Sequence, residues 1–489
     1  MSKKLKTGIA LLCGLVLMAG CKKFVEHDDV NINPNRAPFL TLATALPAVQ
    51  YTTANSHSLL GYVTTMFSQQ MASYPGGPIN DDRNQDVRIN TGFESLYSGL
   101  TNSKLMVELA RGQGSPHYRA IARVIFVTNM SLATDTYGDL PLTEAFRAPE
   151  ILQPKYDKQE DIYAFMHKYL DSAIDEIAQT NPSGLKPGTD DLIFAGDMDA
   201  WKKTAWLLKA RLYMHTTKKG AATAANNALT AVANAYAPGA KDYQLIFSER
   251  NPNPWFVNVS GRISGSATYT IGPSKRFVDA INGTAYPGLV DPRISKIISK
   301  PAAQAQYTGI VNGASLTGNT ADLTDATYYA TRLSPLVIAS YAEQKLIEAE
   351  ARFIANGGTV TSTGSTQEAY DAYLAAIRAN MTKVGVAPGD IDTYINNPLV
   401  GVGAAGLKLE HIMREKMVAM FLHPDMWVDV RRYDYNPALF IGFALPSNQD
   451  PIMGGQFIRR ALYPLEEINR NPNAQGALKP MTEKLWWDQ

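Results

Sequence analysis

The stretch that decides the fold class is Ile162–Thr180, which reads IYAFMHKYLDSAIDEIAQT. Its apolar side chains recur every three or four residues, at Ile162, Phe165, Met166, Tyr169, Leu170, Ala173, Ile174 and Ile177. This spacing places them on one face of an α-helix, where they can be buried together. Asp157 and Glu160 have the spacing of a capping box at the start of the helix, and Pro182 follows its end. The stretch therefore predicts an amphipathic helix that packs against other helices.

Similar patterns pair into helix hairpins elsewhere in the chain. A helix over Asp199–Thr216 is followed by the Ala-rich segment Ala221–Ala237, and a helix over Leu336–Ala355 is followed by one over Gln367–Met381. Further helices are predicted at Ser58–Met71, His117–Ala133 and Leu407–Leu422. Because repeated hairpins stack into solenoids, the sequence predicts a mainly α fold, a tetratricopeptide-like helical-hairpin scaffold with little β structure, although no strict repeat period is visible.

Long irregular loops decorate this scaffold. They are rich in Gly, Asn, Asp, Ser, Thr and Tyr, and lie at Ser73–Asn90, Leu185–Gly196, Phe247–Gly272 and Ile298–Ser334. Loops of this length in a compact protein are usually functional surfaces. No linker divides the chain, so residues 39–489 are predicted to form a single helical domain.

The N-terminus has the pattern of an export signal. Lys3, Lys4 and Lys6 precede the apolar run Ile9–Ala19, which is shorter than the roughly 20 residues that a membrane span needs. Met18-Ala19-Gly20-Cys21 resembles the lipobox of bacterial lipoproteins. Residues 1–20 are therefore predicted to be a lipoprotein signal peptide, Cys21 the lipidation site, and the polar stretch 21–38 a tether. The alternative is an ordinary secretory signal beside an unmodified Cys21.

Composition excludes several classes of protein. The 489 residues contain 46 Lys+Arg and 45 Asp+Glu, a formal net charge of +1, with 45% hydrophobic residues. Such a chain is neither disordered overall nor suited to binding nucleic acid.

The motifs that could carry chemistry are all incomplete. Gly401–Gly406 matches G-x-G-x-x-G, but no strand can precede it because Pro398 lies just upstream. Asp82-x-Asn84-x-Asp86 has calcium-loop spacing without the turn Gly and the bidentate Glu. His411 and Glu415 share a helix face but are two ligands at most. The sequence therefore predicts no catalytic residue, no metal site and no cofactor.

Aromatic and polar side chains in the loops are the candidates for ligand binding. They are Tyr74, Asn80, Arg83, Trp255, Arg262 and Tyr269. An aromatic face can stack on a sugar ring or a peptide side chain, while Asn and Arg supply directed hydrogen bonds. Trp255 is the central candidate, and Trp255→Ala is expected to lower ligand affinity more than melting temperature. The opposite result would assign Trp255 to the core, which is the alternative at this position.

Several strings resemble the signatures of one known family. They are Asp135-Thr136-Tyr137-Gly138-Asp139-Leu140-Pro141, Tyr156-Asp157 with Gln159-Glu160 and Ile162-Tyr163, Asp291-Pro292-Arg293, Glu415-Lys416, Trp427-Val428-Asp429-Val430-Arg431-Arg432, and Tyr463-Pro464. In order and spacing this series is similar to the SusD/RagB family of outer-membrane nutrient-binding lipoproteins. His423-Pro424-Asp425 departs from the turn that many members carry, as in a more divergent branch.

The resemblance implies a surface-exposed, lipid-anchored outer-membrane protein. Such a protein binds an oligosaccharide or peptide, delivers it to a SusC-like TonB-dependent transporter, and is not an enzyme. The resemblance also implies that the signature strings are scaffold, with Arg431 and Arg432 paired to acids. Two alternatives stay open: a surface lipoprotein glycoside hydrolase, which would need two carboxylates about 5–10 Å apart, and a structural surface scaffold without a ligand.

Overall fold

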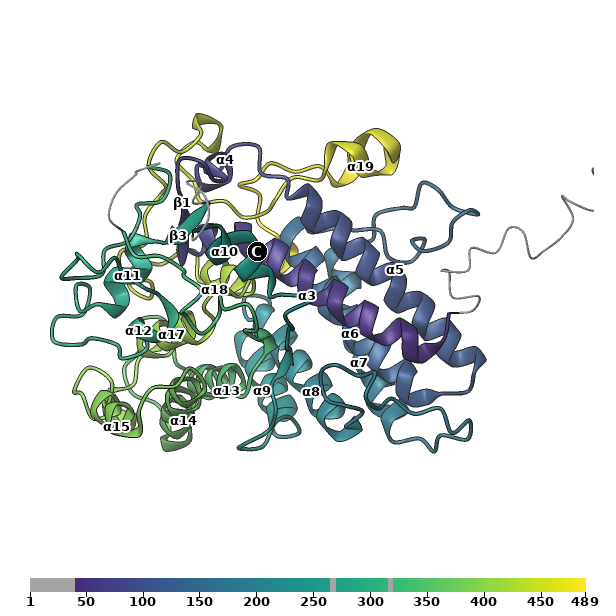
Figure 1. Ribbon diagram of the computed structural model, residues 1–489, viewed down its shortest axis with the longest axis horizontal. Coiled ribbons are helices and arrows are strands. Elements are labelled where there is room, and N and C mark those ends of the chain that lie inside the picture. The colour runs from purple at the N-terminus through teal and green to yellow at the C-terminus, as the bar shows by residue number, and fades with distance from the viewer. Residues whose placement is uncertain (1–39, 264–269, 315–319) are drawn as a thin grey trace, which may run out of the picture.

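Helices that pack on their neighbours along the chain make up most of the molecule (Figure 1). The computed structural model describes residues 40–263, 270–314 and 320–489. The predicted signal peptide and tether, with Cys21, lie outside the described residues, as does Tyr269.

The first half of the chain consists of long helices in sequential contact. Their bounds are α3 Leu42–Phe67, α5 Asn90–Gly112, α6 Pro116–Tyr137, α7 Gln159–Ile177, α8 Met198–His215 and α9 Ala221–Val232, with the short α4 at Ile79–Asp82. Helix α5 packs on α6, α6 on α7, α7 on α8 and α8 on α9, so each apolar face is buried against a neighbouring helix. Asp197 begins α8, since its carboxylate accepts hydrogen bonds from the N–H groups of Asp199 (3.0 Å) and Ala200 (3.1 Å).

The second half adds one hairpin and a more irregular part. Helices α13 (Tyr341–Ala355) and α14 (Gln367–Lys383) pack together, and α13 also packs on α9, which joins the two halves. The other helices are α10 Gly261–Ile263, α11 Lys275–Ile281, α12 Ile294–Ile297, α15 Pro388–Ile395, α16 Gly403–Gly406, α17 Leu409–Ala419, α18 Met426–Arg432 and α19 Leu465–Arg470, with single turns η1 Phe256–Ser260, η2 Pro451–Met453, η3 Pro472–Ala477 and η4 Trp486–Asp488. The predicted mainly α, helical-hairpin fold is confirmed.

The strands of the described residues form two short antiparallel pairs. Strand β1 (Met71–Ser73) pairs with β3 (Ile271–Pro273), and β2 (Tyr243–Leu245) pairs with β4 (Leu336–Ala339). Each pair joins segments that lie far apart in the sequence. The β1–β3 pair lies on the irregular side of the molecule, between α4 and α11 (Figure 1).

Several predicted boundaries need correction. Helix α3 begins at Leu42 rather than near Ser58, and α5 was not predicted at all. Residues Leu336–Ala339 were predicted to begin a helix, but they form β4. Its sequence LVIA is rich in β-branched residues, and pairing with β2 selects the extended form. Ser340 then starts α13 with a capping box to Glu343.

Asp157 does not have the predicted capping role. Helix α7 begins after Lys158, and its first N–H group, that of Gln159, donates to the carboxylate of Asp139 (2.8 Å). The Asp157 carboxylate instead accepts hydrogen bonds from the N–H groups of Leu142 (2.8 Å) and Thr143 (2.9 Å). It therefore fixes the turn that follows α6 rather than the start of α7.

Buried ion pairs hold the signature strings in the interior. Arg293 pairs with Asp291 (2.6 Å) and Glu415 (2.5 Å), and all three side chains are at most 3% exposed. Arg432 pairs with Asp429 (2.7 Å) and with Glu350. Breaking such a buried pair leaves an uncompensated charge, so these strings belong to the scaffold.

Arg431 corrects one expectation, because it forms no ion pair with an acid of the described residues. Its guanidinium donates to the carbonyls of Asp135 (2.7 Å) and Arg459 (2.8 Å) and lies 3.7 Å from the ring centroid of Trp427. Carbonyl groups and an aromatic face stabilise this buried cation in place of a carboxylate.

One large hydrophobic cluster runs through both halves of the described chain. A separate small cluster is formed by Ala72, Tyr74 and Ile310 beside the β1–β3 pair. Across the described ranges, helices that combine the length and the apolar character needed to cross a membrane are absent.

Candidate ligand-binding face and a buried ionic cluster

Three of the four predicted loops meet beside the β1–β3 pair. The N–H of Tyr74 donates to the carbonyl of Thr270 (3.1 Å), and the N–H of Ile310 donates to the carbonyl of Pro273 (2.9 Å). These bonds bring together segments from three distant parts of the chain. We call this surface the loop face, made of residues 74–86, 256–262 and 308–313.

Asp82 ties the loop face together. Its carboxylate is 1% exposed and accepts hydrogen bonds from the N–H groups of Ser73 (2.9 Å) and Gly313 (2.8 Å) and from Nδ2 of Asn312 (2.7 Å). Asp86, in contrast, pairs with Arg88 at 2.8 Å. The carboxylates that gave this segment its calcium-like spacing thus have separate partners and do not converge on an ion.

A polar pocket of about 570 Å³ opens within the loop face. Asn80, Asp81, Gln85 and Asp86 line it, and Asn80 is exposed. Burial, together with the neighbouring charge of Asp82, raises the pKa of Asp81 to about 6. Amide and carboxyl groups at one opening can donate and accept several hydrogen bonds, as recognition of hydroxyl or peptide groups requires.

Both predicted arginines lie at the loop face. Nε of Arg83 donates to the carbonyl of Gly313 (2.9 Å), whereas the side chain of Arg262 is exposed. Tyr62 of α3 is half-buried beside Arg262 and Thr270, and burial raises its pKa. Sequence reasoning missed Tyr62 because its position inside a long helix carries no signal of a nearby loop.

Two of the predicted stacking residues are buried, which corrects the expectation for their rings. Tyr74 is 6% exposed, and its hydroxyl donates to Oδ1 of Asp322 (2.7 Å). Trp255 is 3% exposed and belongs to the main hydrophobic cluster. Nδ2 of Asn253 donates to the carbonyl of Ser334 (2.8 Å), which holds this loop against the core. The ring of Trp255 is therefore a core element rather than a platform at the surface.

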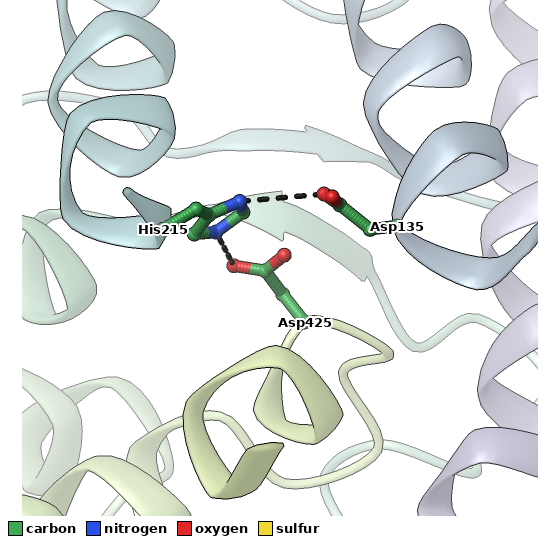
Figure 2. Close-up of side chains that lie close together, drawn as sticks. All are labelled: Asp135, His215 and Asp425. Atoms are coloured by element: carbon green, nitrogen blue, oxygen red, sulfur yellow. Dashed lines mark hydrogen bonds and ion pairs between the residues drawn. The ribbon is translucent and has the colours of Figure 1, made fainter. Parts of the chain in front are cut away.

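A second group of functional side chains lies deep between the helices (Figure 2). Asp135 of α6, His215 of α8 and Asp425 just before α18 offer one ligand atom each, all within 4.8 Å of one another. Nδ1 of His215 lies 3.3 Å from Asp135 Oδ2, and its Nε2 lies 3.2 Å from Asp425 Oδ2. Tyr163 also donates to Asp135 (2.5 Å).

Without a bound cation, the electrostatics of this cluster are those of a buried ion triad. Burial alone lowers the pKa of His215, but attraction to Asp425 and Asp135 outweighs it and raises the pKa to about 9. Although burial opposes it, attraction to His215 and Arg211 holds the pKa of Asp425 well below its usual range. At neutral pH the ring is therefore an imidazolium, and its positive charge lies between the two carboxylates. The triad ties three helices together.

Packed helix hairpins that carry a polar loop face define a helical-hairpin scaffold protein. The family model described as "Starch-binding associating with outer membrane", SusD-like, matches residues 34–464. The chain therefore belongs to the SusD-like family. The comparison with curated proteins returns no match.

Solved structures show the same fold. A SusD/RagB family protein from Bacteroides thetaiotaomicron is 21% identical with a TM-score of 0.75, covering 92% of this chain and 99% of that one. A chitin-binding SusD homolog from Flavobacterium johnsoniae is 19% identical with a TM-score of 0.69, covering 91% and 98%. A third structure, from Bacteroides vulgatus, is described as a putative outer membrane protein probably involved in nutrient binding, with 20% identity, a TM-score of 0.70 and coverage of 92% and 100%.

Proposed function

We propose that this protein is an outer-membrane surface lipoprotein that binds nutrient oligomers and delivers them to a SusC-like TonB-dependent transporter. The observation that carries the proposal is the family match over residues 34–464, whose description combines starch binding with the outer membrane. The polar loop face supplies a surface on which such a ligand can bind.

A glycan is the favoured ligand within this proposal, and a peptide is the alternative. The family description and the chitin-binding structural neighbour both point to saccharides. Asn80 and Arg262 are exposed, and Arg83 and Asp81 are partly so. Planar amide, carboxylate and guanidinium groups suit the paired hydroxyls of a sugar ring, and Tyr62 adds a half-buried aromatic side chain beside them.

Calorimetric titration with malto-oligosaccharides, chito-oligosaccharides and short peptides tests this site. We expect Asn80→Ala and Arg262→Ala to weaken binding by about tenfold each, since each removes a directed hydrogen-bonding group. Asn226→Ala on α9 and Arg111→Ala on α5 are matched controls, because both residues are exposed and lie outside the loop face. Equal affinity in all four variants would contradict the placement of the site.

The same ligands distinguish binding from hydrolysis. Incubation of the purified protein with the tightest ligand should return it intact, as judged by release of reducing ends or of free amino groups. Turnover that depends on this protein would favour the hydrolase alternative.

The anchor and the transporter are tested in the membrane. We expect mass spectrometry of the mature chain to find an acylated Cys21 as its first residue, and Cys21→Ser to release the protein from the membrane. Affinity capture of the protein from solubilised outer membrane should recover a β-barrel transporter. An unmodified, freely secreted chain, or capture without such a partner, would argue against this part of the proposal.

A further inference from the structure

A second pocket, of about 360 Å³, lies beside α11 and is distinct from the polar pocket of the loop face. We call it the Arg276 pocket. Its lining includes Gln69, Arg276, Val311, Asn312, Ile441 and Leu445. Helix α11 borders the β1–β3 pair on the irregular side of the molecule (Figure 1).

The walls of the Arg276 pocket are held by hydrogen bonds between distant segments. Nε2 of Gln69 donates to the carbonyl of Ala444 (2.5 Å), and the N–H of Ser447 donates to the carbonyl of Asn312 (2.8 Å). These bonds fix the loop around Ala444 and Ser447 against the segment that follows α3 and against the loop around Asn312. The pocket is therefore a formed feature of the fold.

Arg276 is a buried cation without a matching anion among the described residues. It is 6% exposed, its Nε lacks a hydrogen-bond acceptor, and Nη1 contacts only the sulfur of Met417. It takes part in none of the ion pairs between described residues. The pKa of Arg276 falls to about 9 because burial disfavours the charged form, with only Tyr286 acting in the opposite direction.

Three other buried arginines find carboxylate partners within the chain. Arg293 faces two carboxylates, as does Arg432, and Arg211 pairs with Glu343 at 2.7 Å. Burying a charge is costly unless a counter-charge or hydrogen bonds compensate it. Arg276 lines a pocket large enough for a small molecule, so an external anion can supply the compensation that these other arginines find within the chain.

The surroundings of Arg276 orient its guanidinium group. The carbon Cζ lies 4.9 Å from the ring centroid of Phe443 and 5.8 Å from that of Phe440. Asp279, an acidic residue that lines the same pocket, is paired with Lys275, which neutralises the charge of its carboxylate. A planar guanidinium packed on aromatic rings presents its edge to a carboxylate in a fixed geometry.

The rim of the pocket is apolar and open to solvent. Val311, Ile441 and Leu445 are 36%, 37% and 38% exposed. Apolar groups beside a buried cation match a ligand that has both a charged end and an apolar body.

We propose that the Arg276 pocket binds the carboxylate of a small organic acid, with Arg276 donating to the carboxylate and Val311, Ile441 and Leu445 packing on the acid's apolar part. This site goes beyond the proposed function and does not depend on the polar pocket of the loop face, with which it shares no lining residue. The acid can be an amino acid, the C-terminus of a peptide or a uronic acid, because each of them carries a carboxylate.

Calorimetric titration of the whole mature protein distinguishes these sources. The probes are N-acetyl-L-leucine and D-glucuronate, with N-acetyl-L-leucinamide and D-glucose as neutral counterparts of the same shape. We expect at least one acid to bind at least about tenfold more tightly than its counterpart, since a charge-assisted hydrogen bond is lost in the neutral molecule. The acid that binds identifies the source. Absence of binding by both acids, or equal affinity for an acid and its counterpart, would overturn the proposal.

Two sets of variants separate binding from folding. Arg276→Met should weaken the binding of the acid by about tenfold or more without lowering the melting temperature, because it replaces an uncompensated buried charge by an apolar side chain. Leu445→Glu places a carboxylate at the exposed rim and should also abolish acid binding, whereas the matched Leu445→Gln should retain it. Undiminished acid binding in Arg276→Met or in Leu445→Glu would refute the assignment. If Arg276→Met does not fold, Leu445→Glu alone provides the test.

Discussion

Stability should fall at alkaline pH because of the buried triad of Asp135, His215 and Asp425. The pKa of His215 in the folded protein is raised from an ordinary 6.5 to about 9, since two carboxylates face the ring. A group with a raised folded pKa contributes stability that is fully present below the unfolded pKa and is lost as the pH rises through the folded one. At 1.36 kcal/mol per pKa unit, the contribution is about 3 kcal/mol, present below about pH 6.5 and lost above about pH 9.

Urea unfolding of the wild type and of His215→Gln, measured from about pH 6 to about pH 10, tests this magnitude. The variant cannot be protonated, so its free energy of unfolding should be lower by about 3 kcal/mol at the acid end and converge with that of the wild type at the alkaline end. His167→Gln is the matched control: burial lowers the pKa of His167 to about 4, so this ring is neutral in the folded protein over the whole range and, above about pH 7, in the unfolded chain as well. Parallel pH profiles for the wild type and His215→Gln would refute the reasoning.

Three further predictions concern other buried groups. Burial and the neighbouring Asp82 raise the pKa of Asp81 to about 6, so protonation stabilises the loop face as the pH falls through about 6; the protection of this loop against amide hydrogen exchange, corrected at each pH for the intrinsic exchange rate, should rise at lower pH, and Asp81→Asn should weaken that dependence without abolishing it, since burial also raises the pKa of Asp82 to about 6. Trp255→Ala should lower the free energy of unfolding by about 3–5 kcal/mol while the ligand affinity of the folded protein changes little. Denaturation and calorimetric titration measure the two quantities, and a large loss of affinity with unchanged stability would contradict the prediction. Arg432→Met should lower the free energy of unfolding by about 3 kcal/mol or more, because it leaves the buried Glu350 with too little positive charge around it. Arg378→Met removes one partner of an exposed pair and should lower the free energy of unfolding by less than about 1 kcal/mol in the same denaturation assay.

Local sequence patterns correctly predicted much of the helical fold. The helix predicted from Ile162 is α7, and the hairpin predicted around Gly220 is α8 followed by α9. Helical periodicity depends on side chains three and four residues apart, so it can be read without knowing any distant contact. Leu336–Ala339 was misassigned for the complementary reason, because pairing with the distant β2 decided its conformation.

The candidate site was harder to predict than the scaffold. Asn80, Arg83 and Arg262 do lie at the loop face, because loops rich in polar residues stay at the surface. Trp255 does not, since a loop sequence cannot reveal whether an aromatic ring turns outward or packs on the core. Tyr62 was missed because only the position of Thr270 makes it part of this surface.

The sequence by itself determined the helical-hairpin scaffold, the polar character of its loops, and the series of strings that places the chain among SusD-like proteins. These properties depend on residues that are close together in the sequence, because the spacing of such residues sets periodicity, turns and motifs. Only the tertiary structure decided that Asp135, His215 and Asp425 share one buried cluster, that Trp255 belongs to the core, and that Arg276, which lines a pocket, has no carboxylate partner among the described residues. Burial and charge compensation depend on groups brought together from distant parts of the chain, and a local sequence pattern does not predict such long-range contacts.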